Sequence, residues 1–243
     1  MRTLTFAKRT AKEILRDPLT LAFGLGFPVV LLLLLSAIQA NIPVPLFEIQ
    51  TLAPGMTVFG LSFMTLFSAT LIAKDRESAL LQRLYATPMT GLDFILGYML
   101  PMLPIAFIQG ICCFLVGALL GLELTANTLV AALFVLPNSL FFIAMGLMLG
   151  SLLNQKQVGG ICGALLTNLT AWFSGLWFDL DMVGGTFRKI ADLLPFVHGV
   201  KLEQAAAAGE LAFALPHLLW VLGYGIVALV LAVFVFLKKM RAG

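Results

Sequence analysis

Long apolar runs separated by short polar intervals form the main pattern of this chain. Six runs lie at about residues 21–40, 54–73, 94–120, 128–153, 159–178 and 214–237, and none of them contains Asp, Glu, Lys or Arg. A helix needs about 20 mostly apolar residues to cross a bilayer. The pattern therefore predicts an all-α membrane protein with six transmembrane helices. Because these spans use most of the chain, we expect one domain over residues 1–243.

Residues 2–17 predict an amphipathic helix instead of a span. Its apolar residues recur at helical spacing at Leu4, Ala7, Ala11, Ile14 and Leu15. Its basic residues include Lys8, Arg9, Lys12 and Arg16, of which the two lysines and Arg16 stand four apart on another face. Such a helix lies along the inner membrane surface, and Asp17 before Pro18 is expected to end it. Anionic lipid alone explains its charge, and contact with a cytoplasmic partner is an equal alternative.

The polar interval at residues 74–93 interrupts the apolar pattern most strongly. Its first charged residues are Lys74, Asp75, Arg76, Glu77 and Arg83. Two pairs of apolar residues stand four apart, Leu80 with Leu84 and Leu81 with Tyr85, and predict a short helix with an apolar ridge. Asp75 and Glu77 are expected at its start, where negative charge complements the helix dipole. A helix this short must dock to be stable, either on its own bundle, on lipid headgroups or on a soluble partner.

The segment before the last apolar run, residues 179–213, is long and mixed in charge. Phe187, Ile190 and Leu194 suggest one short amphipathic helix that Pro195 breaks, and residues 199–208 predict a second helix. Neither is long enough to cross a bilayer. We expect both to enter the outer leaflet or to cap the bundle there.

Composition and charge agree with this reading of the pattern. Of the 243 residues, 60% are hydrophobic and 11% are charged, and the mean hydropathy is +1.03. Soluble domains average about 25% charged residues. Twelve of the 15 Lys and Arg residues fall on the side of the predicted spans that holds both termini. Since the side richer in Lys and Arg is normally cytoplasmic, both termini and the interval 74–93 are expected there.

The predicted spans carry few groups capable of chemistry. Those that stand out are Gln109, Asn138, Asn168 and Tyr224, with His217 near an outer end. Ion-coupled carriers usually place ionisable groups within their spans, so neither a proton relay nor an intramembrane hydrolase is indicated. Two His and three scattered Cys do not match metal-ligand spacing, and there is no GxxxxGK[ST] phosphate loop. We therefore predict no catalytic, cofactor or metal site in this chain, which would not be an enzyme.

One group of residues is a candidate lining for a transport pathway. Its members are Asn138, Asn168, Trp172, Phe173 and Trp177. The aromatic members fit two interpretations, an exit for aromatic drugs or sugars and the outer aromatic belt of a membrane protein.

Two stretches give the chain a resemblance to a known family. Residues 76–97, RESALLQRLYATPMTGLDFILG, resemble the segment after the second span in type-2 ABC exporter permeases, also called the ABC-2 type or type V fold. Both have an acidic–basic start, a leucine-rich short helix, a Thr-Pro and a later Gly. Residues 194–204, LPFVHGVKLEQ, are similar to the signature before the last span of that family, at the positions Pro195, Phe196, His198 and Gln204. Ser174 and Gly175 match its Ser-Gly before an outer hairpin.

The resemblance implies a drug-exporter-like membrane subunit in the plasma (inner) membrane of a bacterium or archaeon. Two copies, or this chain and a paralogous permease, would assemble with a separate ATP-binding subunit that holds ATP and Mg. The implied coupling-helix contacts with that subunit are Asp75, Arg76, Glu77, Leu80, Leu81, Arg83, Leu84 and Tyr85. The signature Pro195, Phe196, His198 and Gln204 would lie in the outer leaflet. Membrane lipid is the remaining expected partner, and no nucleic acid is expected.

The uncharged interior favours a hydrophobic or amphipathic cargo, such as a drug, a peptide or a lipid. Two alternatives to an ATP-driven exporter stay open. An autonomous secondary transporter or channel would carry out transport that is driven by an ion gradient, with no ATPase present. A membrane sensor or assembly protein would bind a partner without transport. The scarcity of ionisable groups in the spans weakens the first of these alternatives.

Overall fold

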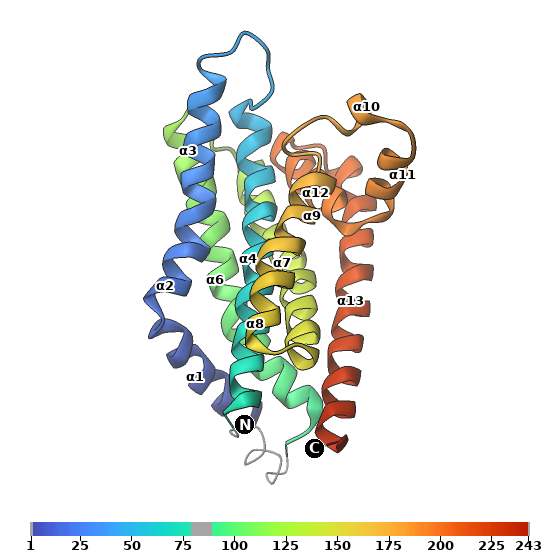
Figure 1. The fold of residues 1–243 in the computed structure, drawn as a ribbon. Coiled ribbons are helices and arrows are strands. Elements are labelled where there is room, and N and C mark those ends of the chain that lie inside the picture. The colour runs from blue at the N-terminus through green and yellow to red at the C-terminus, as the bar shows by residue number, and fades with distance from the viewer. Residues whose placement is uncertain (1, 79–88, 243) are drawn as a thin grey trace.

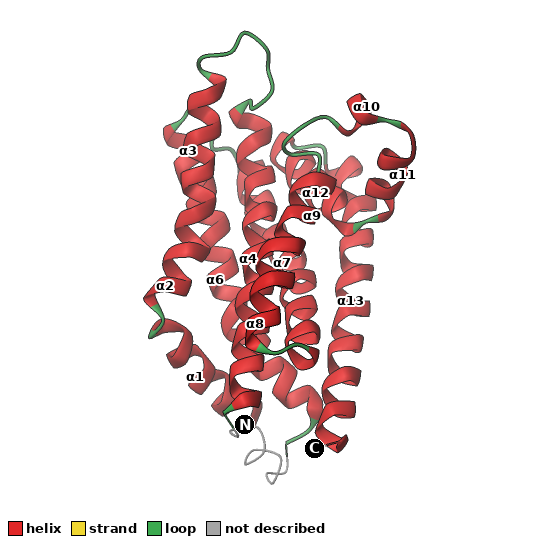
Figure 2. Cartoon of the chain, viewed as in Figure 1, coloured by secondary structure: helices red, strands yellow, loops and turns green. Residues whose placement is uncertain are grey.

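The computed structural model describes residues 2–78 and 89–242, and the regular elements over these residues are helices (Figure 1; Figure 2). In this part of the chain, five helices are long and apolar enough to cross a membrane. They are the stretch Ala22–Gln39, made of the π-helix η1 (Ala22–Gly26) and α3 (Phe27–Gln39), and α4 (Ile49–Glu77), α6 (Gly91–Leu119), α7 (Ala126–Leu152) and α13 (Leu211–Ala242). The prediction of an all-α membrane protein is confirmed.

The segment predicted as a span at residues 159–178 has a different form. Here α8 (Gln155–Val158), the π-helix η2 (Gly159–Leu166) and α9 (Thr167–Phe173) follow one another as one helical stretch beside α4. With Lys156 and Asn168 in its sequence, this stretch does not count among the five apolar helices. Gly175, at φ 73°, follows its end in a conformation that other residues rarely adopt. The count of six spans therefore stays a prediction.

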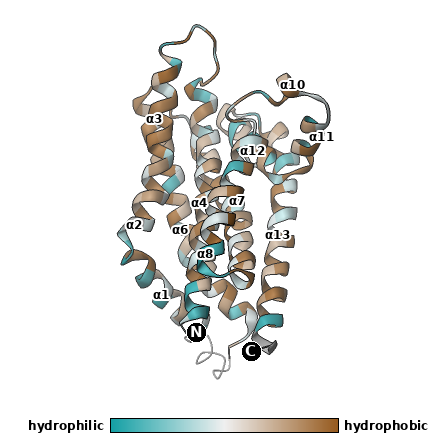
Figure 3. Cartoon of the chain, viewed as in Figure 1, coloured by the Kyte–Doolittle hydropathy of each residue, from teal (hydrophilic) through white to brown (hydrophobic). Residues whose placement is uncertain are grey.

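Both termini lie at one end of the bundle, which we call the terminal end (Figure 1). Hydrophilic residues gather there on α1, on α8 and on the last turn of α4, whereas the middle of the long helices is mainly hydrophobic (Figure 3). This arrangement is the one that the distribution of charge along the sequence predicts.

Helix α4 forms the centre of the bundle. In its most apolar stretch 72% of the residues are buried, against 22% in the apolar stretch of α13, and it packs against α3, α6, α7 and α12. The helix extends beyond the predicted span at 54–73 at both ends, because it begins at Ile49 and continues through the charged residues to Glu77. Contacts with remote residues, described below, satisfy these charges.

The backbones of α4 and α7 touch because α7 has small residues at the contact. A methyl group at Gly146 would lie 2.3 Å from the carbonyl oxygen of Thr65, and one at Gly150 would lie 2.3 Å from that of Ala69. The close approach also lets the Thr65 hydroxyl donate a hydrogen bond of 2.8 Å to the carbonyl oxygen of Phe142. Small residues spaced four apart allow such contacts between membrane helices.

The N-terminal helix α1 (Arg2–Leu15) packs on α6 and is followed by α2 (Pro18–Leu21). Asp17 ends α1 as predicted, and its carboxylate accepts hydrogen bonds from the backbone and hydroxyl of Thr20 at 3.1 and 2.7 Å. Leu4 and Leu15 do not belong to the buried face of α1, since they are 70% and 68% exposed. The bundle face of α1 is instead formed by Phe6, Ala7, Thr10 and Ile14.

Three short helices precede α13 at the end of the bundle opposite the termini: α10 (Leu180–Val183), α11 (Gly185–Leu193) and α12 (Pro195–Ala208) (Figure 1). The two predicted helices correspond to α11 and α12. Pro195 begins α12, which therefore starts four residues before the predicted position, because proline suits the first turn of a helix. Helix α12 is mostly buried against α4, α7 and α13. Its position relative to a lipid leaflet stays a prediction.

The α4–α7 contact gives a first prediction. Gly150→Ala should lower the melting temperature of the purified protein in detergent, because the added methyl group meets the α4 backbone and overpacking costs about 1–3 kcal/mol. Gly223→Ala on α13 is the matched control, since nothing lies within 4 Å of a methyl group there. Helix propensity alone predicts that the control is as stable as the parent or more stable. Equal melting temperatures for the two variants would contradict the close contact.

Candidate functional site

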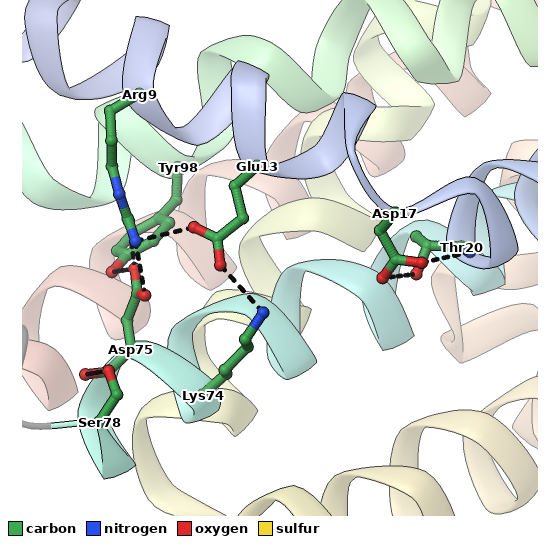
Figure 4. A network of polar contacts seen from close by, with 8 residues as sticks. All are labelled: Arg9, Glu13, Asp17, Thr20, Lys74, Asp75, Ser78 and Tyr98. Carbon is green, nitrogen blue, oxygen red and sulfur yellow. Dashed lines mark hydrogen bonds and ion pairs between the residues drawn. The ribbon is translucent and has the colours of Figure 1, made fainter.

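The last turn of α4 carries a buried carboxylate that joins three helices (Figure 4). Asp75 is 2% exposed. Two guanidinium nitrogens of Arg9 on α1 donate to it at 2.5 and 2.9 Å, and the hydroxyl of Tyr98 on α6 donates at 2.8 Å. Hydrogen bonding to the Asp75 carboxylate raises the pKa of Arg9. Charge-assisted, two-pronged pairs of this kind fix geometry as well as providing energy.

Two further charges complete what we call the Asp75 network, formed by Arg9, Glu13, Lys74, Asp75 and Tyr98. Glu13 on α1 forms ion pairs with Arg9 at 2.8 Å and with Lys74 on α4 at 3.2 Å. A positive and a negative side chain of α1 therefore face a negative and a positive side chain of α4 across the contact (Figure 4).

The two charged residues that follow Asp75 bind the other side of the bundle. Arg76 donates to the carbonyl oxygen of Ser151 and, at 2.7 Å, to that of Leu153, at the end of α7. Glu77 accepts a hydrogen bond of 3.0 Å from the backbone N–H of Gln155, at the start of α8. The end of α4 is thus connected to four neighbouring helices.

The prediction that Asp75 and Glu77 begin a helix is wrong. Both lie in the last turn of α4, where negative charge opposes the helix dipole and is offset by the partners just described. Among the implied contacts with an ATPase, Leu80, Leu81, Arg83, Leu84 and Tyr85 lie outside the described residues. Asp75, Arg76 and Glu77 are engaged within the chain, at the end of α4.

After the interval, the first turn of α6 makes a second contact with α1. Thr90 caps α6, with its hydroxyl accepting from the backbone of Asp93 while Asp93 accepts from the backbone of Thr90. The other carboxylate oxygen of Asp93 accepts from the Thr3 hydroxyl at 2.5 Å. Helix α1 therefore holds both ends of the interval between α4 and α6, through Arg9 at one end and Thr3 at the other.

An aromatic pocket of about 570 Å³ opens between α3, α4, η2 and α9. It contains three of the predicted pathway residues, Asn168, Trp172 and Trp177. The other two lie elsewhere: Phe173 stacks on Phe187 of α11 with ring centroids 4.7 Å apart, and Asn138 is buried against α12. Because Trp172 is 51% exposed, it can contact both the pocket and a lipid or protein surface.

A buried glutamate on α12 was missed by the sequence analysis. Glu203 is fully buried, and its one hydrogen bond among the described residues comes from the Asn138 amide at 2.9 Å. Burial raises the pKa of Glu203 well above its ordinary value and so favours the neutral, protonated form. The residues next to Glu203 in the sequence do not indicate that it is buried, because a short segment of mixed charge usually lies at the surface. The neighbouring signature residue Gln204 donates to the carbonyl oxygen of Thr51 at 3.0 Å.

The two histidines form a pair that the sequence did not indicate. The Nδ1 atoms of His198 and His217 are 2.8 Å apart, and Nε2 of His198 is 2.9 Å from the carbonyl oxygen of Asp192. His198 must donate to that carbonyl, so its Nδ1 accepts from His217. The ring of His198 also stacks on Trp220 at 4.8 Å.

The remaining signature residues serve packing: Pro195 begins α12, and Phe196 contacts Phe141 and Phe142. The signature therefore docks α12 on α7 and α13.

This fold and these sites define a multi-pass, all-α membrane protein whose polar contacts organise the two ends of a helical bundle. The family model for the ABC-2 type transporter matches residues 1–206, and the chain belongs to this family as a permease membrane subunit. A comparison with curated proteins gives no match.

The Asp75 network gives a second prediction. In a double-mutant cycle of Arg9→Gln and Asp75→Asn, the coupling energy should be about 1–3 kcal/mol, because Arg9→Gln alone leaves the buried Asp75 carboxylate without its cation. The free energy of unfolding would be measured in mixed detergent micelles. The control cycle, Arg188→Gln with Asp181→Asn, removes a pair whose aspartate is 74% exposed, and should give less than about 1 kcal/mol. Equal coupling in the two cycles would refute a special role for Asp75.

Glu203 gives a third prediction, on pH dependence. Its pKa is raised on folding, so its contribution to stability is complete below the unfolded pKa of about 4.3 and is lost as pH rises toward the folded value. The stability of the parent relative to that of Glu203→Gln should therefore fall as the pH rises from about 5 to about 8. Glu203→Gln, which imitates the neutral acid, should be less sensitive to pH and more stable than the parent at pH 8. The exposed Glu210→Gln should behave like the parent, and an unchanged pH profile in Glu203→Gln would refute the assignment.

Proposed function

We propose that this chain is the membrane-spanning permease subunit of an ATP-driven exporter. A separate ATP-binding subunit would supply the energy and hold ATP and Mg, and the permease itself would not be an enzyme. Two permeases, either identical or paralogous, would form the pathway. The proposed location is the plasma (inner) membrane of a bacterium or archaeon, with both termini cytoplasmic. Family membership supports the class of subunit, and the geometry supports the way in which it would be coupled.

The observation that carries the proposal is the attachment of both ends of the 79–88 interval to α1. Arg9 binds Asp75 before the interval, and Thr3 binds Asp93 after it. A force applied to the interval by a soluble partner would therefore reach α4, α6 and α1 together. A loop without such attachments would yield locally and transmit little. This is the arrangement expected of a coupling element, whose partner must bind two bundle conformations with different affinity.

The aromatic pocket supports a hydrophobic or amphipathic cargo. Its described walls are mainly apolar and aromatic, with Thr167 and Asn168 as polar groups, and they carry no formal charge. Ligand sites of this size usually combine apolar walls with a few polar groups that orient the ligand. A drug, a lipid or an apolar peptide would fit this chemistry better than an ion.

One observation favours the alternative of an autonomous, ion-coupled transporter. Glu203 is a buried acid beside α7, and buried ionisable groups in membrane proteins often bind transported protons. That alternative requires transport driven by a pH gradient in vesicles that contain this chain alone. The exporter proposal requires that such vesicles be inactive until the ATP-binding subunit and ATP are added.

The fourth prediction tests the exporter proposal directly. The tagged chain, extracted gently from its native membranes, should retain a stoichiometric soluble subunit that has a phosphate loop, as identified by mass spectrometry. Leu84→Asp should abolish this association or uncouple ATP hydrolysis from transport, because it places a charge on the predicted apolar ridge. Gln82→Asp adds the same charge off that ridge and is the matched control. A parent chain that purifies alone would favour an autonomous carrier or a sensor, and the coupling-helix assignment would then be withdrawn.

A further inference from the structure

A basic groove lies along α1 and adjoins a small apolar cavity behind it. The groove, of about 900 Å³, is lined by Lys8, Lys12 and Arg16 among other residues of α1 and the α1–α2 bend. The cavity, of about 60 Å³, lies between α1, α2, α4 and α6. Its apolar walls are Ile14, Leu21, Phe67, Leu71, Met102 and Ile105. Glu13, Asp17 and Lys74 line both spaces, so the groove and the cavity adjoin each other.

The groove has a surplus of positive charge that the chain does not neutralise. Its lining has five cations, Lys8, Arg9, Lys12, Arg16 and Lys74, against two acids, Glu13 and Asp17, and Glu13 is already paired with Arg9 and Lys74. By contrast, Lys8, Lys12 and Arg16 make no ion pair with any described residue. Like charges four apart on a helix destabilise it, so this stripe gains nothing from contacts within α1. An external anion would remove the repulsion.

The exposed face of α1 indicates where that anion comes from. Leu4 and Leu15 point away from the bundle, and on the helical wheel they lie side by side next to Lys8. Helix α1 thus has a bundle face, an apolar edge exposed to its surroundings and a basic stripe beside that edge. A helix at a membrane surface has this arrangement, with apolar side chains among the acyl chains and cations at the level of the phosphates.

We propose that the groove and the cavity together bind one anionic phospholipid. Its phosphate would lie among Lys8, Lys12 and Arg16, and a few methylene groups of an acyl chain would enter the cavity between α2, α4 and α6. The cavity favours a lipid over an acidic protein surface or free phosphate, because neither of those would fill an apolar space. Since the lipid would touch α1, α2, α4 and α6 at once, it would stabilise the docking of α1 that holds both ends of the 79–88 interval.

The test uses the full chain purified in detergent and titrated with phosphatidylglycerol or phosphatidylcholine, with bound lipid counted by native mass spectrometry. Phosphatidylglycerol should bind the parent more tightly than phosphatidylcholine does. The triple variant K8Q/K12Q/R16Q should bind phosphatidylglycerol on the order of 100-fold more weakly, since each cation near an anionic headgroup contributes about 1 kcal/mol. The control triple K156Q/K238Q/K239Q removes three exposed cations from the same end of the bundle. An equal loss in the control would overturn the proposal in favour of general charge attraction.

A second variant tests the acyl chain separately. Thr70→Phe places a ring at the cavity wall, and should weaken phosphatidylglycerol binding while leaving the basic groove intact. Binding of phosphatidylglycerol that is unchanged in Thr70→Phe would overturn the acyl-chain assignment. Inorganic phosphate that competes with the lipid at equal concentration would show a simple anion site instead. Loss of the ATP-binding subunit from the K8Q/K12Q/R16Q variant with lipid binding intact would show that the stripe docks a protein. None of these readouts requires transport, so failure here is distinguishable from failure of the exporter proposal.

Discussion

The requirement that a buried carboxylate be paired governs the terminal end of this molecule. An isolated carboxylate in an apolar environment is very costly, and losing one partner of a buried pair is strongly destabilising. Asp75 is buried at the end of the central helix, so α1 must dock for Arg9 to reach it, and α6 must present Tyr98 from its first turns. The path of the N-terminal helix, the end of α4 and the start of α6 all depend on this charge. An amphipathic helix that could have been a simple surface anchor is thereby part of the bundle.

At the opposite end of the bundle, a second buried carboxyl group avoids an unpaired charge in a different way. Glu203 has an amide partner and no cation, so it avoids the cost of a buried charge by binding a proton. The nearby His198–His217 pair also depends on protonation, because its hydrogen bond requires that one Nδ1 atom be unprotonated. Helix α12 is therefore held in part by neutral groups that share protons, whereas α1 is held by a pair of opposite charges. The two ends of one bundle thus rely on different electrostatic contacts.

Much of the fold could be predicted from the sequence, because five spans have apolar runs that need no distant information. The limits of the elements were less predictable. Helix α4 continues through Lys74–Glu77 because distant groups bind its charged side chains. Arg9 and Tyr98 donate to the carboxylate, and the carbonyl groups at the end of α7 accept from the guanidinium, and these partners lie far away in the sequence. Glu203 and Asn138 are 65 positions apart, and no local pattern connects them. Three pathway residues did come together in one pocket, because Asn168 and Trp172 are four apart on one helix and Trp177 follows closely.

The π-helix η2 determines which side chains the pocket presents. In an α-helix each residue turns the chain by about 100° around the axis, and wider winding reduces that angle. Helix α9 continues from η2 without a break, so the rotational phase of Asn168 and Trp172 accumulates over Gly159–Leu166. Deleting one residue there, or rewinding the segment as an α-helix, would rotate both side chains around the axis while leaving every residue of the pocket in the sequence. The side chains that this wall of the pocket presents therefore depend on the rotation of the helix about its axis as much as on the residues it contains.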